Sequence, residues 1–217
     1  MSGRLVLVRH AESESNILQK LDTRPPGAAL TARGKEQASA LARTARSWQA
    51  DVLISSIALR AQQTAEPLVR ATGRELQIVE GIHEIQAGEL EDRADREAHE
   101  RYLEAYAAWL HGDPSVRIPG GESGEEVLQR YLPIVGELRD RYVSQGGTVV
   151  VVSHGAVIRY VAAQLSGVTP MFAIMNRLRN TGAVELQTTS DGWELARWGE
   201  LQAPFTDVAE QVRDVMG

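Results

Sequence analysis

The side chains of this sequence that are best suited to chemistry follow short apolar stretches. They come directly after such a stretch or within four positions of its end: Arg9, His10, Arg60, Glu84 and His154. A chain that only had to turn would place Gly, Asn or Asp at these positions. The set instead contains two guanidinium groups, two imidazoles and one carboxylate, so it is positive overall and includes one acid.

This set suits the transfer of a phosphoryl group. Arg presents a planar fork that matches phosphate oxygens, and the neutral imidazole of His10 can attack phosphorus to form a covalent intermediate. Arg9, Arg60 and His154 can stabilise the charge on the transferring group. Glu84 can protonate the leaving oxygen and later deprotonate a water molecule. We expect these five residues to be catalytic.

The residue set requires neither a metal ion nor a cofactor. A zinc site built from His10, His154 and Glu84 is an alternative, but Arg9 and Arg60 would repel the cation. The chain has no cysteine, which excludes disulfides and Cys-ligated metals. The sequence therefore predicts no metal site and no cofactor.

The apolar stretches predict a sheet that would bring the catalytic candidates together. Four of them have the length and the continuous apolar character of central strands: residues 4–8, 51–56, 77–82 and 148–153. Helical spacing of apolar residues, as in 34–48 and 156–165, alternates with them. We expect an α/β fold, a three-layer α/β/α sandwich with a mostly parallel mixed sheet, as a single domain over residues 1–217. Ligands of such sheets bind beyond the carboxyl ends of the strands, so the strand exits would meet in one cleft.

Other segments are expected at the edges of this sheet. Residues 184–189 and 193–198 flank a turn signal and predict a hairpin that adds antiparallel strands. Residues 85–122 interrupt the alternation, and we interpret them as a helical insertion over the active-site edge, with an amphipathic helix in 94–111. Acidic residues are dense in this region, so Glu89 is the alternative general acid.

A second helix is predicted to follow the insertion. Ser123 and Glu126 have the spacing of a capping box, which marks the start of a helix. Pro133 lies inside the helical pattern, and we expect a kink or an early break there.

The stretch LVRHAESESN (7–16) resembles the signature of the histidine phosphatase superfamily, the phosphoglycerate-mutase-like proteins. Five further stretches are similar to motifs of that family and occur in the family's order: LTARGKEQA (30–38), SSIALRAQQTA (55–65), HEIQAGELED (83–92), PGGES (119–123) and VVVVSHGAVIR (149–159). Together these motifs cover roughly residues 5–165.

The resemblance implies the same roles for the five strand-exit residues, with His10 as the phosphorylated nucleophile. It adds Asn16 as a further donor to the phosphate. The loop of residues 17–29 departs from the aromatic-rich loop of the family. Within this loop, Thr23 and Arg24 are the expected substrate contacts.

The sequence thus predicts a metal-independent phosphomonoesterase that acts through a phosphohistidine on a small phosphorylated metabolite. One alternative is a 2,3-bisphosphoglycerate-dependent phosphoglycerate mutase. The acidic segment HEIQAGELEDR argues against it, since the family's cofactor-dependent mutases usually carry Glu-Arg-His-Tyr-Gly and a longer basic insertion that binds bisphosphoglycerate. The other alternative is a phosphate-ester or phosphoprotein binding module without turnover.

The composition of the chain indicates which binding partners and which cellular location to expect. The net charge is −6 at pH 7 and the pI is about 5.5, so a nucleic-acid partner is not expected. The apolar runs are too short for a signal peptide or a membrane span. We expect a cytoplasmic protein without a membrane partner. The sequence leaves the oligomeric state open, with a homodimer among the options.

Overall fold

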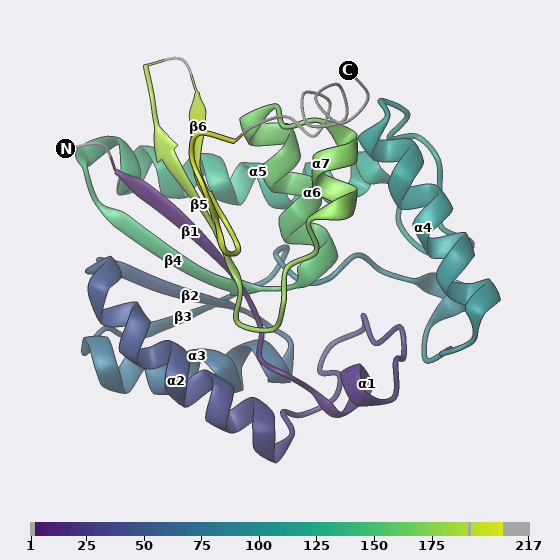
Figure 1. Ribbon diagram of the computed structural model, residues 1–217, viewed down its shortest axis with the longest axis horizontal. Coiled ribbons are helices and arrows are strands. Elements are labelled where there is room, and N and C mark those ends of the chain that lie inside the picture. The colour runs from purple at the N-terminus through teal and green to yellow at the C-terminus, as the bar shows by residue number, and fades with distance from the viewer. Residues whose placement is uncertain (1–2, 191, 206–217) are drawn as a thin grey trace, which may run out of the picture.

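The structure, a computed structural model, describes residues 3–190 and 192–205, and within them seven strands form one mixed sheet (Figure 1). The strands are β1 (Arg4–Arg9), β2 (Val52–Ser56), β3 (Leu76–Val79), β4 (Thr148–Ser153), β5 (Ala183–Thr188), β6 (Trp193–Trp198) and β7 (Leu201–Gln202). Their order in the sheet is β3-β2-β4-β1-β5-β6-β7. The first four are parallel, and the last three add antiparallel pairs. This confirms the predicted mixed sheet with a parallel core, including the antiparallel hairpin.

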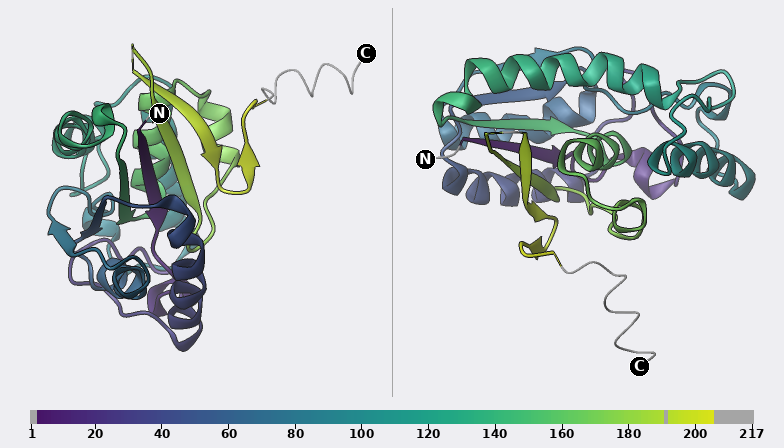
Figure 2. Two further views of the ribbon diagram at one scale, coloured as in Figure 1. Left: turned by 90° about the vertical axis from the view of Figure 1, so that its left-hand side faces the viewer. Right: turned by 90° about the horizontal axis from the view of Figure 1, so that it is seen from above.

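Helices cover both faces of the sheet (Figures 1 and 2). They are α1 (Glu14–Ile17), α2 (Ala32–Trp48), α3 (Leu59–Thr72), α4 (Arg96–Leu110), α5 (Gly124–Arg141), α6 (Gly155–Ser166) and α7 (Pro170–Met175), with short 3-10 turns at Gly88–Leu90 and Val143–Gln145. In β1, Val6 and Val8 pack with α2 and α3, whereas Leu5 and Leu7 pack with the core that α4 to α7 complete. A strand buried on both faces has no polar positions to alternate, which explains the continuous apolar runs.

The pairing of β1 with β4 sets the position of two histidines. Arg9 pairs with Ser153 in the parallel register, and the backbone N–H of His10 donates to the carbonyl of Ser153 at 3.0 Å. His10 and His154 therefore leave neighbouring strands at the same end of the sheet. Helix α4 lies beyond that end (Figure 1) and contributes side chains to the cavity described below.

Two details differ from the sequence-based expectation. Strand β3 ends at Val79, three residues earlier than predicted, and the chain then turns towards the strand exits. Helix α5 continues through Pro133 without a break. Pro133 and Gln129 are both exposed, so water can satisfy the carbonyl of Gln129 that lost its helical donor. Buried residues on the opposite side of the helix, such as Tyr131, hold it against the core.

Residues 1–2 and 206–217 of the predicted domain lie outside the described residues. In the described part of the chain, no helix combines the length and apolar character that crossing a membrane requires.

We predict that Pro133→Ala raises the free energy of unfolding by about 2 kcal/mol. Pro costs about 3 kcal/mol in a helix interior, and the stiffer unfolded chain returns up to about 1 kcal/mol. Urea unfolding followed by circular dichroism measures the change. Gly136→Ala in the same helix is the matched control, because its new Cβ meets open space, and it should gain about 1 kcal/mol. A loss of stability in Pro133→Ala would contradict this account of α5.

Candidate active site

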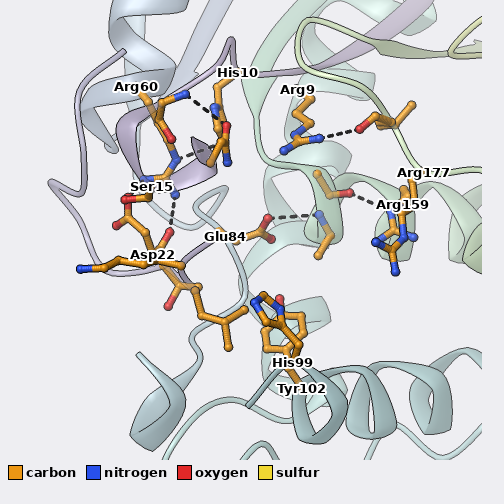
Figure 3. Close-up of a pocket in the computed structure, with 18 of the residues that line it drawn as sticks. Arg9, His10, Ser15, Asp22, Arg60, Glu84, His99, Tyr102, Arg159 and Arg177 are labelled. Atoms are coloured by element: carbon orange, nitrogen blue, oxygen red, sulfur yellow. Dashed lines mark hydrogen bonds and ion pairs between the residues drawn. The ribbon is translucent and has the colours of Figure 1, made fainter. Parts of the chain in front are cut away.

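A cavity of about 250 Å³ opens beyond the carboxyl ends of the parallel strands (Figure 3). Six of the residues selected from the sequence line it: Arg9, His10, Asn16, Thr23, Arg60 and Glu84. His154 does not line the cavity. It is fully buried next to His10, with 5.2 Å between the two ring centroids. The alternative acid Glu89 is exposed and lies outside the lining, as does Arg24.

His10 is held as a neutral imidazole in which one defined nitrogen is unprotonated. Its Nδ1 lies 2.7 Å from the carbonyl oxygen of Ala11, so this nitrogen carries the proton and donates. Its Nε2 accepts a hydrogen bond from Nε of Arg60 at 3.2 Å. Burial lowers the pKa of His10 well below its usual value, and the charges of Arg60 and Arg9 lower it further. The residue therefore presents an unprotonated Nε2, as a nucleophilic imidazole must.

Two guanidinium groups supply positive charge around this imidazole. Arg60 is only 2% exposed, and its Nη2 donates to the backbone carbonyl of Asp22 at 2.9 Å, while Nη1 lies 3.4 Å from the Asp22 carboxylate. Arg9 donates through Nη1 to the carbonyl of Leu178 at 2.6 Å. Burial lowers the pKa of both groups, although Asp22 opposes this at Arg60 and Glu84 opposes it at Arg9. Such partly desolvated cations are well suited to bind an anion.

His154 packs behind the nucleophile. Its Nε2 lies 2.9 Å from the hydroxyl of Ser56, the last residue of β2, and Nδ1 is buried without a partner among the described residues. Burial lowers its pKa well below the usual value, and the charge of Arg60 adds to this effect. A buried nitrogen without a partner costs free energy, and no described side chain compensates for this one.

Glu84 sits at the start of α6. Its carboxylate accepts hydrogen bonds from the backbone N–H groups of Val157 at 2.9 Å and Ala156 at 3.1 Å, and from its own neighbour Ile85 at 3.0 Å. The first turn of a helix offers free N–H groups and a positive dipole end, which hold a carboxylate in place. The carboxylate still faces the cavity, so it can exchange a proton with a bound group.

A partly buried ion pair clamps the loop that carries Glu84. On α5, Arg130 donates to both oxygens of Glu122, at 2.6 and 2.9 Å. The same guanidinium also donates to the carbonyls of Gly81, His83 and Glu84. Glu122 belongs to the PGGES stretch, and the sequence suggested no role for Glu122 itself. The clamp shows that this stretch positions the loop that carries Glu84.

Asn16 and Thr23 differ in whether their side-chain donors are available to a ligand. The Oδ1 of Asn16 accepts from the backbone N–H of Ser13 and from the amide of Asn180, which leaves its Nδ2 for a ligand. The hydroxyl of Thr23 instead donates to Glu91 and accepts from the N–H of Ala87. Thr23 therefore ties its loop to the insertion, and its single O–H donor is engaged by Glu91 rather than by a substrate.

Several lining residues were not selected from the sequence. Helix α4 brings His99 and Tyr102 to the cavity, and Tyr102 is at the same time part of the hydrophobic core. Arg159 could have been found, since it ends the VVVVSHGAVIR stretch one turn after Gly155. Arg177 had no sequence signal. Among the residues that the structure describes, no cluster of three or more His, Asp or Glu side chains is arranged to hold a metal ion.

The chain is similar to known proteins over most of its length. The sequence model of the histidine phosphatase superfamily (branch 1) matches residues 5–201. Phosphoserine phosphatase 1 of Hydrogenobacter thermophilus is 36% identical over 76% of this chain and 77% of its own length. A 2,3-bisphosphoglycerate-dependent phosphoglycerate mutase of Cytophaga hutchinsonii is 31% identical over 93% of this chain and 95% of its own length. The PE-PGRS family protein PE_PGRS11 of Mycobacterium tuberculosis is 31% identical over 94% of this chain, which spans only 39% of that relative.

A solved structure shares the fold. The mycobacterial glucosyl-3-phosphoglycerate phosphatase in complex with VO3 superposes with a TM-score of 0.77, at 25% identity, over 91% of this chain and 98% of that one. The seven-stranded sheet with its parallel core is thus the fold of a histidine phosphatase.

We predict that the protein loses stability as the pH falls below 6.5. The folded pKa values of His10 and His154 are depressed, so below 6.5 the unfolded chain binds protons that the folded chain does not. The free energy of unfolding that the two neutral imidazoles contribute is fully present above the unfolded pKa. Below it, this free energy declines by about 1.4 kcal/mol per pH unit for each imidazole as the pH falls. Urea unfolding at pH 7.5, 6.5 and 5.5 measures this slope.

Substitutions separate the contributions of the individual histidines. His154→Gln should flatten the slope by one imidazole's share, whereas His111→Gln, at an exposed position, should leave it as in the wild type. An unchanged slope in His154→Gln would contradict the assignment of a neutral buried imidazole.

Proposed function

The chain belongs to branch 1 of the histidine phosphatase superfamily, and from this premise we propose that it is a metal-independent phosphomonoesterase acting through phospho-His10. The observation that carries the proposal is the unprotonated Nε2 of His10, which lies beside the buried guanidinium of Arg60. A nucleophile and an anion-binding group at the same point are what phosphoryl transfer to an enzyme needs. The proposed substrate is a small phosphorylated metabolite.

In the first step, Nε2 of His10 attacks the phosphorus of the ester, and the bond to the leaving oxygen breaks. The N–H of Arg60 that now occupies the Nε2 lone pair turns to a phosphate oxygen when the substrate binds. Arg9 and Asn16 donate to the other oxygens, and His154 packs against the ring of His10 from behind. Glu84 gives its proton to the leaving oxygen, so the alcohol departs neutral. The guanidinium groups supply the charge that a metal ion would otherwise provide.

In the second step, water replaces the imidazole on phosphorus. Glu84, now a carboxylate, takes one proton from the water as its oxygen bonds to phosphorus. The bond between phosphorus and Nε2 breaks and its electron pair returns to the nitrogen. Inorganic phosphate leaves, and both His10 and Glu84 are back in their starting protonation states.

Hydrolysis and mutase activity share the first step and differ in what accepts the phosphoryl group. The segment 83–93 is acidic where a mutase would need basic residues to hold its priming ligand, which supports water as the acceptor. The names of relatives include both activities, namely a phosphoserine phosphatase and a phosphoglycerate mutase. The proposal therefore requires an experiment that separates the two.

We predict that the purified protein hydrolyses p-nitrophenyl phosphate in the presence of excess EDTA and that His10→Ala lowers kcat by at least a thousandfold. The loss follows because no second group can accept the phosphoryl unit. Brief reaction with ³²P-labelled substrate followed by an alkaline quench should trap an acid-labile phosphoenzyme in the wild type only. Retained turnover in His10→Ala would contradict the phosphohistidine mechanism.

Two other outcomes assign the alternative functions. Interconversion of 3- and 2-phosphoglycerate that is faster than phosphate release, and dependent on 2,3-bisphosphoglycerate, would identify a mutase. Tight binding of phosphate or vanadate without turnover or phosphoenzyme would identify a binding module.

We predict that Arg130→Met impairs proton donation by Glu84 more than it impairs phosphate binding. Without the clamp on the loop, Glu84 is misplaced, and misplacement matters only when the leaving group needs a proton. The value of kcat/KM should fall about tenfold or more for an alkyl phosphate and much less for p-nitrophenyl phosphate. Arg141→Gln, which removes an exposed ion pair of the same helix, is the control and should change neither value. Equal losses for the two substrates would mean that Arg130 acts only on the fold.

A further inference from the structure

The active-site cavity carries more positive charge than one phosphate group requires. Its lining holds five cationic side chains and two acidic ones: Arg9, Lys20, Arg60, Arg159 and Arg177 against Asp22 and Glu84. The whole chain, in contrast, has a net charge of −6. Arg60 contacts His10, whereas Figure 3 shows Arg159 and Arg177 on the other side of Glu84 from these two residues.

Arg159 is a buried cation without an acidic partner among the described residues. Its side chain is 9% exposed, and it donates to the backbone carbonyls of Gly155 at 3.2 Å and Ala173 at 2.9 Å. Its guanidinium carbon lies 5.0 Å from the ring centroid of Tyr106. These contacts orient the guanidinium but leave its charge uncompensated.

Two other enclosed arginines have acidic partners, whereas Arg159 shares the lack of one, within the described part of the chain, with the phosphate-pocket residue Arg9. Arg60 is paired with Asp22, and Arg130 is paired with Glu122. A buried charge is costly unless it is paired. Because Arg159 lines the cavity, an anion that enters the cavity can provide the missing compensation.

Arg177 is exposed, but the backbone around it is anchored. On one side, the carbonyl of Asn176 accepts from the indole of Trp198 at 2.7 Å. On the other side, the carbonyl of Leu178 accepts from Arg9 at 2.6 Å. The segment that holds the phosphate arginine Arg9 thus also presents Arg177 to the mouth of the cavity.

We propose that Arg159 and Arg177 form a second anion-binding subsite, so that the substrate is a phosphate monoester with a second anionic group, a carboxylate or a phosphate. The proposal rests on the proposed function, because the first subsite is the phosphate pocket around His10. The second anion binds across the cavity from the phosphoryl group that is transferred. It compensates Arg159 and fixes the orientation of the alcohol part of the ester.

The test uses matched substrates that differ only in the distal group. These are alkyl phosphates of two to four carbons, the corresponding ω-phosphooxy carboxylates, and the α,ω-bisphosphates of the same lengths. For wild-type protein, kcat/KM should be at least tenfold higher for one of the doubly anionic series than for the alkyl phosphates. The series that gains identifies whether the second group is a carboxylate or a phosphate.

Variants then assign the preference to the subsite. Arg177→Gln should lower kcat/KM about tenfold for the preferred doubly anionic substrate and less than twofold for the alkyl phosphate of the same length. Arg177→Lys should keep most of the preference. Arg179→Gln is the matched control, since Arg179 lies two residues away, is exposed, pairs with Glu200 and does not line this cavity. It should leave both values unchanged.

The outcomes separate this inference from the proposed function. No preference for a doubly anionic ester at any length, or equal losses for both substrate types in Arg177→Gln, would overturn the subsite while hydrolysis itself stands. Failure to hydrolyse any ester, with no phosphoenzyme, would instead overturn the proposed function. Arg159→Met tests the buried residue of the subsite and should also reduce the preference for the doubly anionic substrate. Thermal unfolding of this variant shows whether the protein is still folded when the preference is lost.

Discussion

The hydrogen bond from Nδ1 of His10 to the carbonyl of Ala11 decides which imidazole nitrogen can react. With Nδ1 as a donor, the lone pair must lie on Nε2, and burial beside two cations keeps it unprotonated. The backbone that makes this bond is held in turn, because the N–H of Ala11 donates to Thr64 at 3.0 Å and the carbonyl of His10 accepts from Asn180 at 3.1 Å. The orientation of one ring is thus set by three separate segments of the chain.

The acid is positioned by a different device. Glu84 follows the edge strand β3 and lies in a loop, where no sheet register fixes it. Backbone N–H groups of α6 hold its carboxylate from one side, and Arg130 of α5 holds its main chain from the other. The nucleophile therefore depends on strand pairing, whereas the acid depends on two helices. A change in either helix can alter proton transfer without moving the nucleophile.

These two devices explain how far the sequence could predict the site. Arg9 ends β1, His10 and His154 come directly after strands, and Arg60 lies in the first turn of the helix after β2. The carboxyl ends of parallel strands must meet, so their positions followed from the pattern. The bond between Thr23 and Glu91, and the place of Arg177, depend on how loops fold against each other. No periodicity encodes such contacts. The course of α5 through Pro133 was missed for a related reason, since the packing and solvent exposure of a helix outweigh its local propensity.

The same division separates the phosphate pocket from the rest of the substrate site. Strand exits build the pocket around His10, and α4, the 17–29 loop and the segment at Arg177 build the walls beyond it. Relatives with similar chains carry names that refer to different phosphate esters. If the strand exits perform the chemistry, the walls must select the ester, because they are the parts free to vary without disturbing the sheet. In this chain the walls carry unpaired guanidinium charge inside an acidic protein. An anion drawn into the cavity is attracted by its local field and repelled by the outer surface, so the charge pattern favours a ligand whose anionic groups can all reach inside.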